Sequence, residues 1–223
     1  MENKFNTQVL SVDDLKIAMH SFILITSRRA SGKSVLVKHL TKKLLDEYDY
    51  DFIILFSDTA NFTKDYDFIN KDFIFKTDQM EDKLDKILKI QEKNVKNNKK
   101  VNGLIILDDI KLHSKSKKLM DLSSMGRHFK LTCLLSCQFP KQVVGTIIRN
   151  NLDYIIWADQ GEIGIKAIYE CTHLGMNFKE FKEFTDKNNH NYQFILYDGR
   201  VQDRKERLKV IRATEYQNLK LKN

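Results

Sequence analysis

Ser27-Arg-Arg-Ala-Ser-Gly-Lys-Ser34 lies between an apolar run at residues 21–26 and a segment at residues 33–45 whose apolar residues recur at helical spacing. The eight residues match the pattern GxxxxGK(S/T) of phosphate-binding loops except at the first position, where serine replaces glycine. Their place between an expected strand and an expected helix is the context that such a loop requires. A nucleotide site is therefore predicted at Ser27, Arg28, Arg29, Ala30, Ser31, Gly32, Lys33, Ser34 and Val35.

Four residues of this loop have a distinct expected role. Backbone N–H groups of the loop and of the following helix N-terminus bind phosphate oxygens. Gly32 permits close backbone approach, Lys33 reaches the terminal phosphates, and Ser34 offers a hydroxyl to Mg²⁺. Ser27 is expected to adopt a turn conformation that glycine adopts more easily, which would weaken nucleotide binding. The alternative is a chance match in an unrelated loop.

Further polar residues follow two other apolar runs. The run at residues 104–107 ends in Asp108 and Asp109. Asp108 is predicted to orient Mg²⁺ through its water shell, and Asp109 to polarise a water for in-line attack on the γ-phosphate. Gln138 follows the run at residues 131–136, at a strand end where ligands bind in open α/β sheets, and can hydrogen-bond the γ-phosphate or that water. The alternative for the aspartates is a solvated acidic turn.

The whole chain alternates short apolar runs with longer helical stretches, which predicts an α/β fold with a mainly parallel sheet flanked by helices. Strands are expected at residues 21–26, 51–56, 72–76, 104–107, 131–136 and 152–157, and a β-hairpin at residues 192–197 and 208–212. Their continuous apolar character is typical of strands covered on both faces. Helices are expected at residues 79–92 and from Pro140, and a basic loop at residues 93–100.

Length and composition narrow the class of protein. The 223 residues suit one domain, with an N-terminal extension at residues 1–20 and C-terminal strands and a basic tail at residues 190–223. A net charge of +8 favours a polyanionic partner. No apolar run approaches the roughly 20 residues of a membrane span, and the first residues do not form a signal peptide, so we expect an intracellular protein without a membrane partner. The three cysteines and six histidines show neither a disulfide pattern nor metal-ligand spacing.

Together these residues resemble the additional-strand P-loop ATPases, and among them the FtsK–HerA-like DNA-packaging ATPases of large DNA viruses and virophages. The resemblance extends from about Phe22 to Trp157. It is carried by SRRASGKS at 27–34, LIILDD at 104–109, GRHFKLTCLLSCQ at 126–138 and IIRNNLDYIIW at 147–157. It implies a RecA/FtsK-like P-loop NTPase domain that uses ATP and Mg²⁺. Ser27 in place of glycine and Asp109 in place of glutamate depart from the family pattern.

The resemblance also implies roles for basic residues. Arg127 matches the arginine finger that acts on the ATP of a neighbouring subunit, Arg149 is the alternative finger, and Arg29 matches an arginine that responds to the γ-phosphate. For each arginine a solvated surface position is the alternative. DNA contacts are expected from the loop after the acidic pair, from the basic loop at residues 93–100, or from the basic tail. The first of these supplies Lys111, Lys115, Lys117 and Lys118.

The function implied by the resemblance is ATP-driven translocation of double-stranded DNA into a viral capsid by a homo-oligomeric ring, a pentamer or a hexamer. A capsid portal or vertex protein is a further candidate partner. The expected location is the host cytoplasm, the viral factory or the virion. Two alternatives stay open. A small-molecule kinase would need a substrate-binding lid, which we do not identify. A non-enzymatic DNA-binding protein with a degenerate P-loop is favoured by Ser27.

Overall fold

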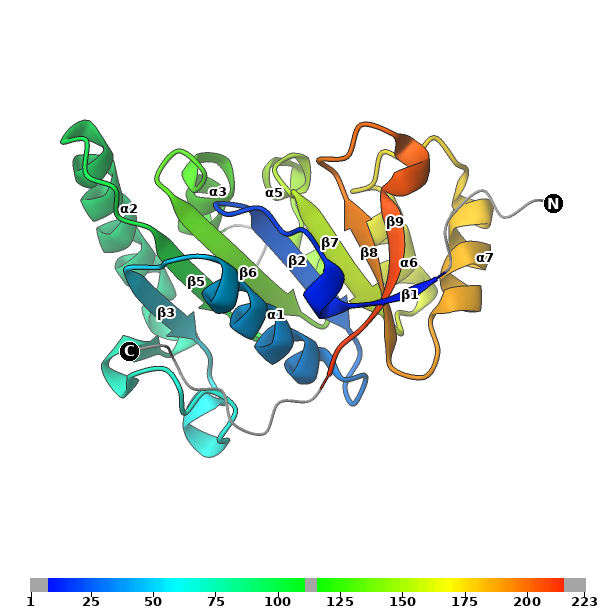
Figure 1. The fold of residues 1–223 in the computed structure, drawn as a ribbon, viewed down its shortest axis with the longest axis horizontal. Helices are drawn as coiled ribbons and strands as arrows, with labels where there is room; N and C mark the ends of the chain where they lie inside the picture. Colours follow the sequence, from blue (N-terminus) through cyan, green and yellow to red (C-terminus); the bar gives the residue numbers. More distant parts are fainter. Residues whose placement is uncertain (1–7, 111–115, 215–223) are drawn as a thin grey trace.

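Nine strands form one sheet in the part of the chain that the computed structural model describes, residues 8–110 and 116–214 (Figure 1). Their order across the sheet is β1-β9-β8-β7-β2-β6-β5-β3-β4. The strands are β1 (Val9–Ser11), β2 (Phe22–Ser27), β3 (Phe52–Phe56), β4 (Ile74–Phe75), β5 (Gly103–Leu107), β6 (Leu131–Cys137), β7 (Tyr154–Ala158), β8 (Gln193–Asp198) and β9 (Leu208–Arg212).

The sheet is mainly parallel, as predicted. From β7 through β2, β6, β5 and β3 to β4, each strand pairs in parallel with its neighbour. β8 is antiparallel to both β7 and β9, so the predicted C-terminal hairpin is confirmed, and its two strands are joined by residues 199–207. β1 then pairs in parallel with β9 at the edge of the sheet.

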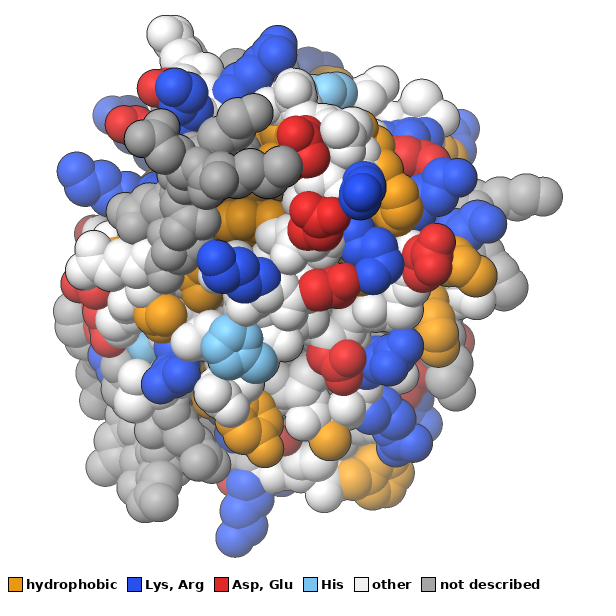
Figure 2. All heavy atoms as spheres, turned by 90° about the vertical axis from the view of Figure 1, so that its right-hand side faces the viewer, with side chains coloured by type: hydrophobic (Ala, Val, Ile, Leu, Met, Phe, Trp, Pro, Cys, Tyr) orange, Lys and Arg blue, Asp and Glu red, His pale blue; other side chains and the backbone are white. Residues whose placement is uncertain are grey.

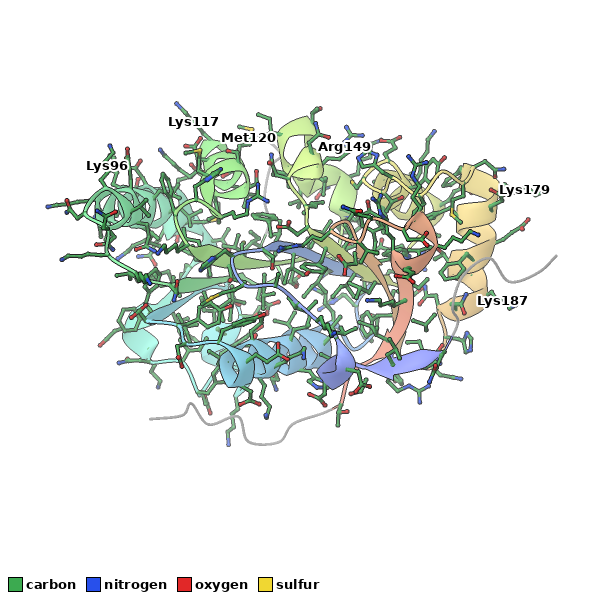
Figure 3. All side chains as sticks on the ribbon, turned by 45° about the horizontal axis from the view of Figure 1, so that its top comes forward. Lys96, Lys117, Met120, Arg149, Lys179 and Lys187 are labelled. Carbon is green, nitrogen blue, oxygen red and sulfur yellow. The ribbon has the colours of Figure 1, made fainter. Side chains whose placement is uncertain are left out.

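Helices cover both faces of the sheet, with α1 on one face and most of the other helices on the opposite face (Figures 1 and 3). The α-helices are α1 (Lys33–Glu47), α2 (Met80–Lys96), α3 (Lys117–Met125), α4 (Pro140–Val143), α5 (Thr146–Asn150), α6 (Glu162–Tyr169) and α7 (Phe178–Asn188). The 3₁₀ turns are η1 (Val12–Asp14), η2 (Ala60–Phe62), η3 (Lys71–Phe73), η4 (Thr77–Gln79) and η5 (Arg204–Glu206). Pro140 is the first residue of α4, where its missing N–H costs no helical hydrogen bond.

Alternation along β2 shows how the continuous apolar runs fill two cores. Ile23 and Ile25 belong to the cluster that includes Leu36 of α1, whereas Phe22 and Leu24 belong to the cluster that includes α2, α3 and α5 to α7. Successive side chains of a strand point to opposite faces, so a strand buried on both faces needs apolar residues at every position. The sequence pattern predicted this arrangement.

Three segments differ from expectation. Residues 9–17, assigned to an N-terminal extension, contribute β1 and the buried side chains of Val12, Leu15 and Ile17. α2 continues to Lys96, so half of the expected basic loop at residues 93–100 is helical. Lys117 and Lys118 begin α3 rather than lying in a loop, because Ser116 caps this helix by accepting a hydrogen bond from the Leu119 N–H.

The surface over α7 and β1 carries interspersed acidic and basic side chains with scattered apolar ones (Figure 2). Such a mixed surface is ordinary for a protein face in contact with water. Within the two described ranges, no helix is both long enough and apolar enough to cross a bilayer.

Candidate functional site

The loop at residues 27–34, the acidic pair and Gln138 meet at one edge of the sheet. They do so because β2, β6 and β5 are neighbours that run in the same direction. These strands end at Ser27, Cys137 and Leu107, so the residues that follow each of them lie at the carboxyl edge. Ligands of open α/β sheets bind at this edge. The predicted grouping of the three motifs is therefore present.

Lys33 is the first residue of α1, and its side chain reaches the acidic pair. Its Nζ donates to Asp109 Oδ1 at 3.0 Å and to Ser136 Oγ at 3.0 Å. The Lys33 side chain is only 9% exposed. A buried ammonium group is costly unless it is paired, and these two oxygens pair it. The lysine that should bind phosphate is thus held between β5 and β6.

Asp109 is held from two sides. Besides the bond from Lys33, Gln138 Nε2 lies 3.1 Å from Oδ1 and 2.9 Å from Oδ2 of this carboxylate. The backbone of Asp109 is left-handed, with φ of 49°, a conformation that costs a residue with a Cβ atom about 1–2 kcal/mol. Aspartate and glutamine are therefore already paired at the position where water attack is expected.

Asp108 lies deeper in the same site and is 6% exposed. It accepts a hydrogen bond from Ser136 Oγ at 2.9 Å, so Ser136 links Asp108 to Lys33. The Tyr66 hydroxyl is buried nearby, close enough to interact with the Asp108 carboxylate but without a hydrogen bond of ordinary geometry among the described residues. Burial, followed by the negative charge of Asp108, raises the pKa of Tyr66 well above its ordinary value, so this phenol stays protonated.

The loop conformation corrects one expectation. Ser27 is the last residue of β2, in register with Ala158, and has no positive φ. Its buried hydroxyl accepts a hydrogen bond from Ser31 Oγ at 2.6 Å. The left-handed positions of the loop are instead Ala30, with φ of 60°, and Gly32, with φ of 86°. Ser27 replaces glycine without strain because the chain is still extended at this position.

The arginines of the loop point toward the end of β7. The Arg28 N–H donates to the Asp159 carbonyl at 3.2 Å, and its guanidinium lies 3.8 Å from the Asp159 carboxylate. Arg29 is exposed and lines a cavity that also borders Gln138. Gln160 joins the two motifs, because its amide donates to Thr26 Oγ1 at 3.0 Å and to the Gln138 carbonyl at 3.3 Å. Arg28 lines the same cavity, so the structure places both arginines of the loop on the side of Gln138.

The donor set suits Mg²⁺ shared with phosphates. Ser34 lies in the first turn of α1, and Asp108 follows β5 at the same edge. A hydroxyl and a carboxylate are hard oxygen ligands, and Mg²⁺ usually takes only one or two protein ligands together with phosphates and water. Among the described residues, no three His, Cys, Asp or Glu side chains are grouped to hold a metal by themselves. The residues fit a metal that arrives with a nucleotide.

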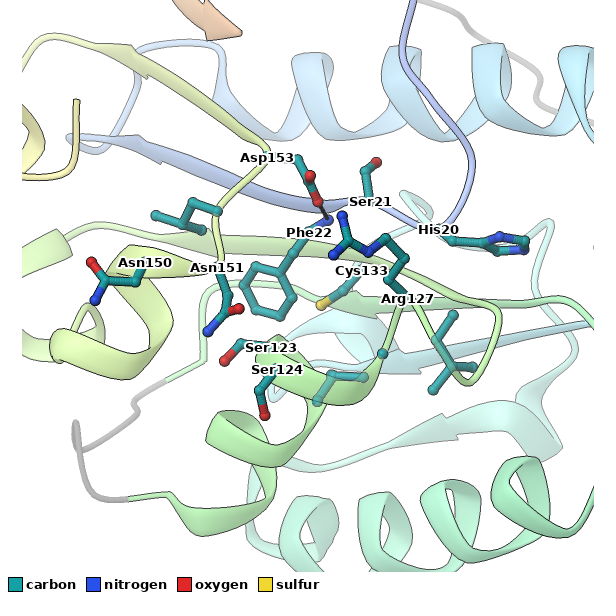
Figure 4. Close-up of a pocket in the computed structure, with 14 residues that line it drawn as sticks. His20, Ser21, Phe22, Ser123, Ser124, Arg127, Cys133, Asn150, Asn151 and Asp153 are labelled. Atoms are coloured by element: carbon teal, nitrogen blue, oxygen red, sulfur yellow. Dashed lines mark hydrogen bonds between the residues drawn. The ribbon is translucent and has the colours of Figure 1, made fainter. Parts of the chain in front are cut away.

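Both candidate finger arginines lie at the other edge of the sheet. Arg127 precedes β6 and lines a cavity of about 120 Å³ with Phe22 and Asp153, residues near the starts of β2 and β7 (Figure 4). Arg149 lies in α5, also before β7, and its guanidinium is 3.3 Å from Glu170 Oε2. Neither arginine therefore joins Lys33 and Asp109 within this chain.

The candidate DNA-binding lysines divide into three cases. Lys111 and Lys115 lie outside the described residues. Lys117 is exposed and points outward from α3 (Figure 3). Lys118 Nζ is 2.7 Å from Asp85 on α2, and its hydrogen bond to this carboxylate raises the pKa of the lysine. In the basic tail, Arg207 donates to the Val201 and His173 carbonyls, so its guanidinium stabilises the fold of this region.

The three cysteines, Cys133, Cys137 and Cys171, are free and buried. Burial raises the pKa of Cys137 to about 11 and that of Cys171 to about 12, and it also raises that of Cys133. Protonated thiols are poor nucleophiles. These cysteines therefore do not supply a thiolate to the site.

The fold and the grouping of the motifs are those of the additional-strand P-loop ATPases. The chain belongs to the poxvirus A32 protein family, whose sequence profile matches residues 2–220. It is 24% identical over 217 residues to the uncharacterized protein L437 of Acanthamoeba polyphaga mimivirus, a match that covers 89% of this chain and 73% of the relative.

Solved structures share the fold. The genome packaging NTPase B204 of Sulfolobus turreted icosahedral virus 2 in complex with sulfate has a TM-score of 0.61 and 18% identity, over 90% of this chain and 98% of that chain. The same NTPase in complex with AMPPCP has a TM-score of 0.59 and 18% identity, over 88% and 98%. The pCW3 conjugation coupling protein TcpA has a TM-score of 0.57 and 16% identity, over 91% of this chain and 63% of that chain.

Sequence reasoning missed three residues of the site. Ser136 lies near the end of β6, two positions before Gln138. Residues two apart on a strand point to the same face, so this spacing could have identified Ser136 from the sequence. Gln160 follows β7 at the carboxyl edge, by the same logic that identified Gln138. Tyr66 comes from the connection between β3 and β4, where the sequence shows no pattern that points to Asp108.

Proposed function

We propose that this chain is a Mg²⁺-dependent ATPase that drives double-stranded DNA into a viral capsid as a subunit of a homo-oligomeric ring. The observation that carries the proposal is the contact of Lys33 with Asp109, itself bonded to Gln138, beside a P-loop. Membership of the poxvirus A32 protein family supports it. A fold neighbour described as a genome packaging NTPase, in complex with AMPPCP, adds support for a triphosphate as ligand.

Each site residue has a defined part in hydrolysis. Lys33 leaves Asp109 to bind the terminal phosphates, which frees one side of the Asp109 carboxylate. Asp109 then polarises a water for in-line attack, and Gln138 orients this water or reports the presence of the γ-phosphate. Ser34 and Asp108 would hold Mg²⁺, which neutralises charge on the β- and γ-phosphate oxygens.

The positions of the two candidate finger arginines support the proposed ring. Lys33 lies at the carboxyl edge of the sheet and Arg127 at the amino edge. If Arg127 or Arg149 stabilises charge on a γ-phosphoryl group, it must then act on the ATP of another copy. We propose a pentamer or hexamer in which Arg127, or Arg149 as the alternative, completes the neighbouring site. The proposed surroundings are a capsid portal or vertex protein, in the host cytoplasm, the viral factory or the virion.

DNA contacts in this proposal are made through phosphates. Lys117 is exposed at the start of α3, and the preceding residues connect it to the acidic pair. Contacts of lysines with the DNA backbone are independent of sequence and sensitive to salt. This property suits a protein that must accept an entire genome.

The test is ATPase activity with and without DNA for Lys33→Ala, Arg127→Ala and Arg149→Ala. Lys33→Ala should abolish hydrolysis. The arginine variant that lacks the finger, Arg127→Ala or Arg149→Ala, should lose hydrolysis but still bind ATP. An arginine finger contributes about 10³–10⁵-fold to the rate in other NTPases. Mixing the Lys33 and Arg127 variants should restore part of the activity, because hybrid interfaces combine an intact P-loop with an intact finger.

Other outcomes would select the alternatives. Hydrolysis that DNA does not stimulate, in a protein that stays monomeric with DNA and ATP, would contradict the proposal. Phosphoryl transfer to a nucleoside or nucleotide without a DNA response would identify a small-molecule kinase. Absence of ATP binding would identify a DNA-binding protein with a degenerate loop.

A further inference from the structure

Two cavities border the loop at residues 27–34, and they differ in chemistry. One is lined by Arg28, Arg29 and Gln138, so it faces the side of the loop where Asp109 lies. The other, of about 590 Å³, is lined by Gly32 and Val35 of the loop and first helical turn, and by Tyr192, Phe194 and Arg212 of the C-terminal hairpin region. The first cavity also contains the exposed ring of Phe139, on the Gln138 side, whereas in the second cavity the ring of Tyr192 adjoins Gly32 of the loop itself.

Tyr192 is the exposed aromatic residue that lines this second cavity. It directly precedes β8, which runs antiparallel to β7, so Tyr192 lies at the same carboxyl edge as the loop. Its side chain is 70% exposed, whereas Phe194 below it is 1% exposed. A Cβ atom added to Gly32 would lie 3.4 Å from Tyr192 Cδ1, so the ring stands in contact range of the loop glycine. A flat, exposed aromatic surface therefore adjoins the expected phosphate position.

The direction of a bound nucleotide decides which cavity receives its base. The γ-phosphate must face Asp109 and Gln138, because these residues act on the attacking water in the proposed function. The α-phosphate and the nucleoside then extend away from Gln138, toward Val35 and Tyr192. Bases stack on aromatic side chains, and exposed guanidinium groups such as that of Arg212 add cation–π attraction.

We propose that Tyr192 stacks on the nucleobase and that the cavity between Val35 and Arg212 is a purine-binding subsite. This inference rests on the proposed nucleotide function. The subsite selects chiefly through the area of the ring, since Tyr192 and Val35 supply the surface next to the loop, and Asn191 and Arg212 are the polar side chains of its lining. Purine triphosphates, with two fused rings, bind more tightly than pyrimidine triphosphates.

The experiment compares binding of ATP, GTP, UTP and inorganic tripolyphosphate by calorimetry. The proteins are the wild type, Tyr192→Leu, which keeps bulk beside Gly32, and Tyr192→Phe, which keeps the ring. Tyr192→Leu should weaken ATP and GTP binding about 5- to 100-fold, the range expected for one base–aromatic stack. It should leave tripolyphosphate binding unchanged and abolish the preference over UTP. Tyr192→Phe should behave as wild type.

Two further measurements test whether Tyr192 stacks on the base. Phe73→Ala removes a partly exposed ring near β4, at the opposite end of the strand order, and should change no affinity. The fluorescence of 2-aminopurine riboside triphosphate should be quenched on binding to the wild type and to Tyr192→Phe, because stacking quenches this base. Binding to Tyr192→Leu should leave it bright.

The possible outcomes separate this inference from the function on which it rests. Unchanged ATP binding by Tyr192→Leu would refute the subsite and leave the phosphate site intact. Equal weakening of ATP and tripolyphosphate would also refute it, because the ring would then support the loop at Gly32 rather than the base. Failure of the wild type to bind any triphosphate would overturn the proposed function together with the subsite.

Discussion

Lys33 Nζ lies 3.0 Å from Asp109 Oδ1, although the two residues are 76 positions apart in the sequence. This ion pair joins the lysine of the P-loop to the acid that follows β5. A terminal phosphate that binds Lys33 competes with the Asp109 carboxylate for the charge of this ammonium group. We therefore expect nucleotide binding to draw Lys33 from Asp109 toward the phosphate, an exchange that gives the variants of these two residues opposite expected effects on ATP affinity.

Asp109→Asn should abolish turnover while ATP binding is retained or becomes tighter. The neutral amide no longer competes with phosphate for the charge of Lys33, and it cannot act as a base toward water. General-base catalysis contributes about 10²–10⁴-fold, so kcat should fall by this factor. Calorimetry and steady-state hydrolysis measure the two effects. Asp121→Asn, an acid on α3, is the matched control, and weaker ATP binding by Asp109→Asn would contradict the exchange.

Glycine substitutions at two loop positions should change stability in opposite directions. Ala30→Gly relieves a left-handed conformation and should raise the free energy of unfolding by up to about 1 kcal/mol. Ser27→Gly removes the hydrogen bond with Ser31 and frees the backbone of the unfolded chain, so it should lower this free energy by about 1–2 kcal/mol. Urea denaturation measures both values. If Ser27→Gly is the stabilising change, the loop conformation described for Ser27 is wrong.

Tyr66→Phe should leave the free energy of unfolding unchanged or raise it, because the buried hydroxyl makes no hydrogen bond of ordinary geometry whose loss would cost stability. Tyr48→Phe is the matched control. Its hydroxyl donates to the Ile17 carbonyl at 2.7 Å, so this variant should lose about 1 kcal/mol. Thermal or urea unfolding compares the two proteins. Reduced hydrolysis by Tyr66→Phe at full stability would assign the hydroxyl a role beside Asp108.

His20 should make folding less stable at mildly acidic pH. Burial lowers its pKa below 6.5, assisted by the positive charge of Lys130 and opposed by the hydrogen bond with Asn102. The unfolded chain then binds a proton more readily than the folded protein, so the free energy of unfolding falls as the pH falls through 6.5. NMR titration should give a pKa below 6.5. Between pH 7.5 and 5.5, His20→Gln should lose less stability than the wild type.

Local pattern was enough to predict most of the sheet and three motifs of the site. Apolar runs such as residues 104–107 define strands buried on both faces, and parallel strands bring Lys33, Asp109 and Gln138 to one edge. The pattern did not predict β1, because its three residues are too short to show alternation and gain their place only by pairing with β9. The sequence motif also led us to expect a strained turn at Ser27, whereas the left-handed residues are Ala30 and Gly32. A motif specifies residue types and not backbone angles.

The sequence by itself determined the class of fold and the identity of the residues that form the loop between β2 and α1, because these depend on spacing along one strand–loop–helix unit. Only the tertiary structure decided which groups from distant segments complete the site. Ser136 bridges Lys33 and Asp108, Tyr66 is buried beside Asp108, and Tyr192 stands against Gly32. Such contacts depend on how strands far apart in the chain are ordered in the sheet, and residue spacing along the chain does not specify this order.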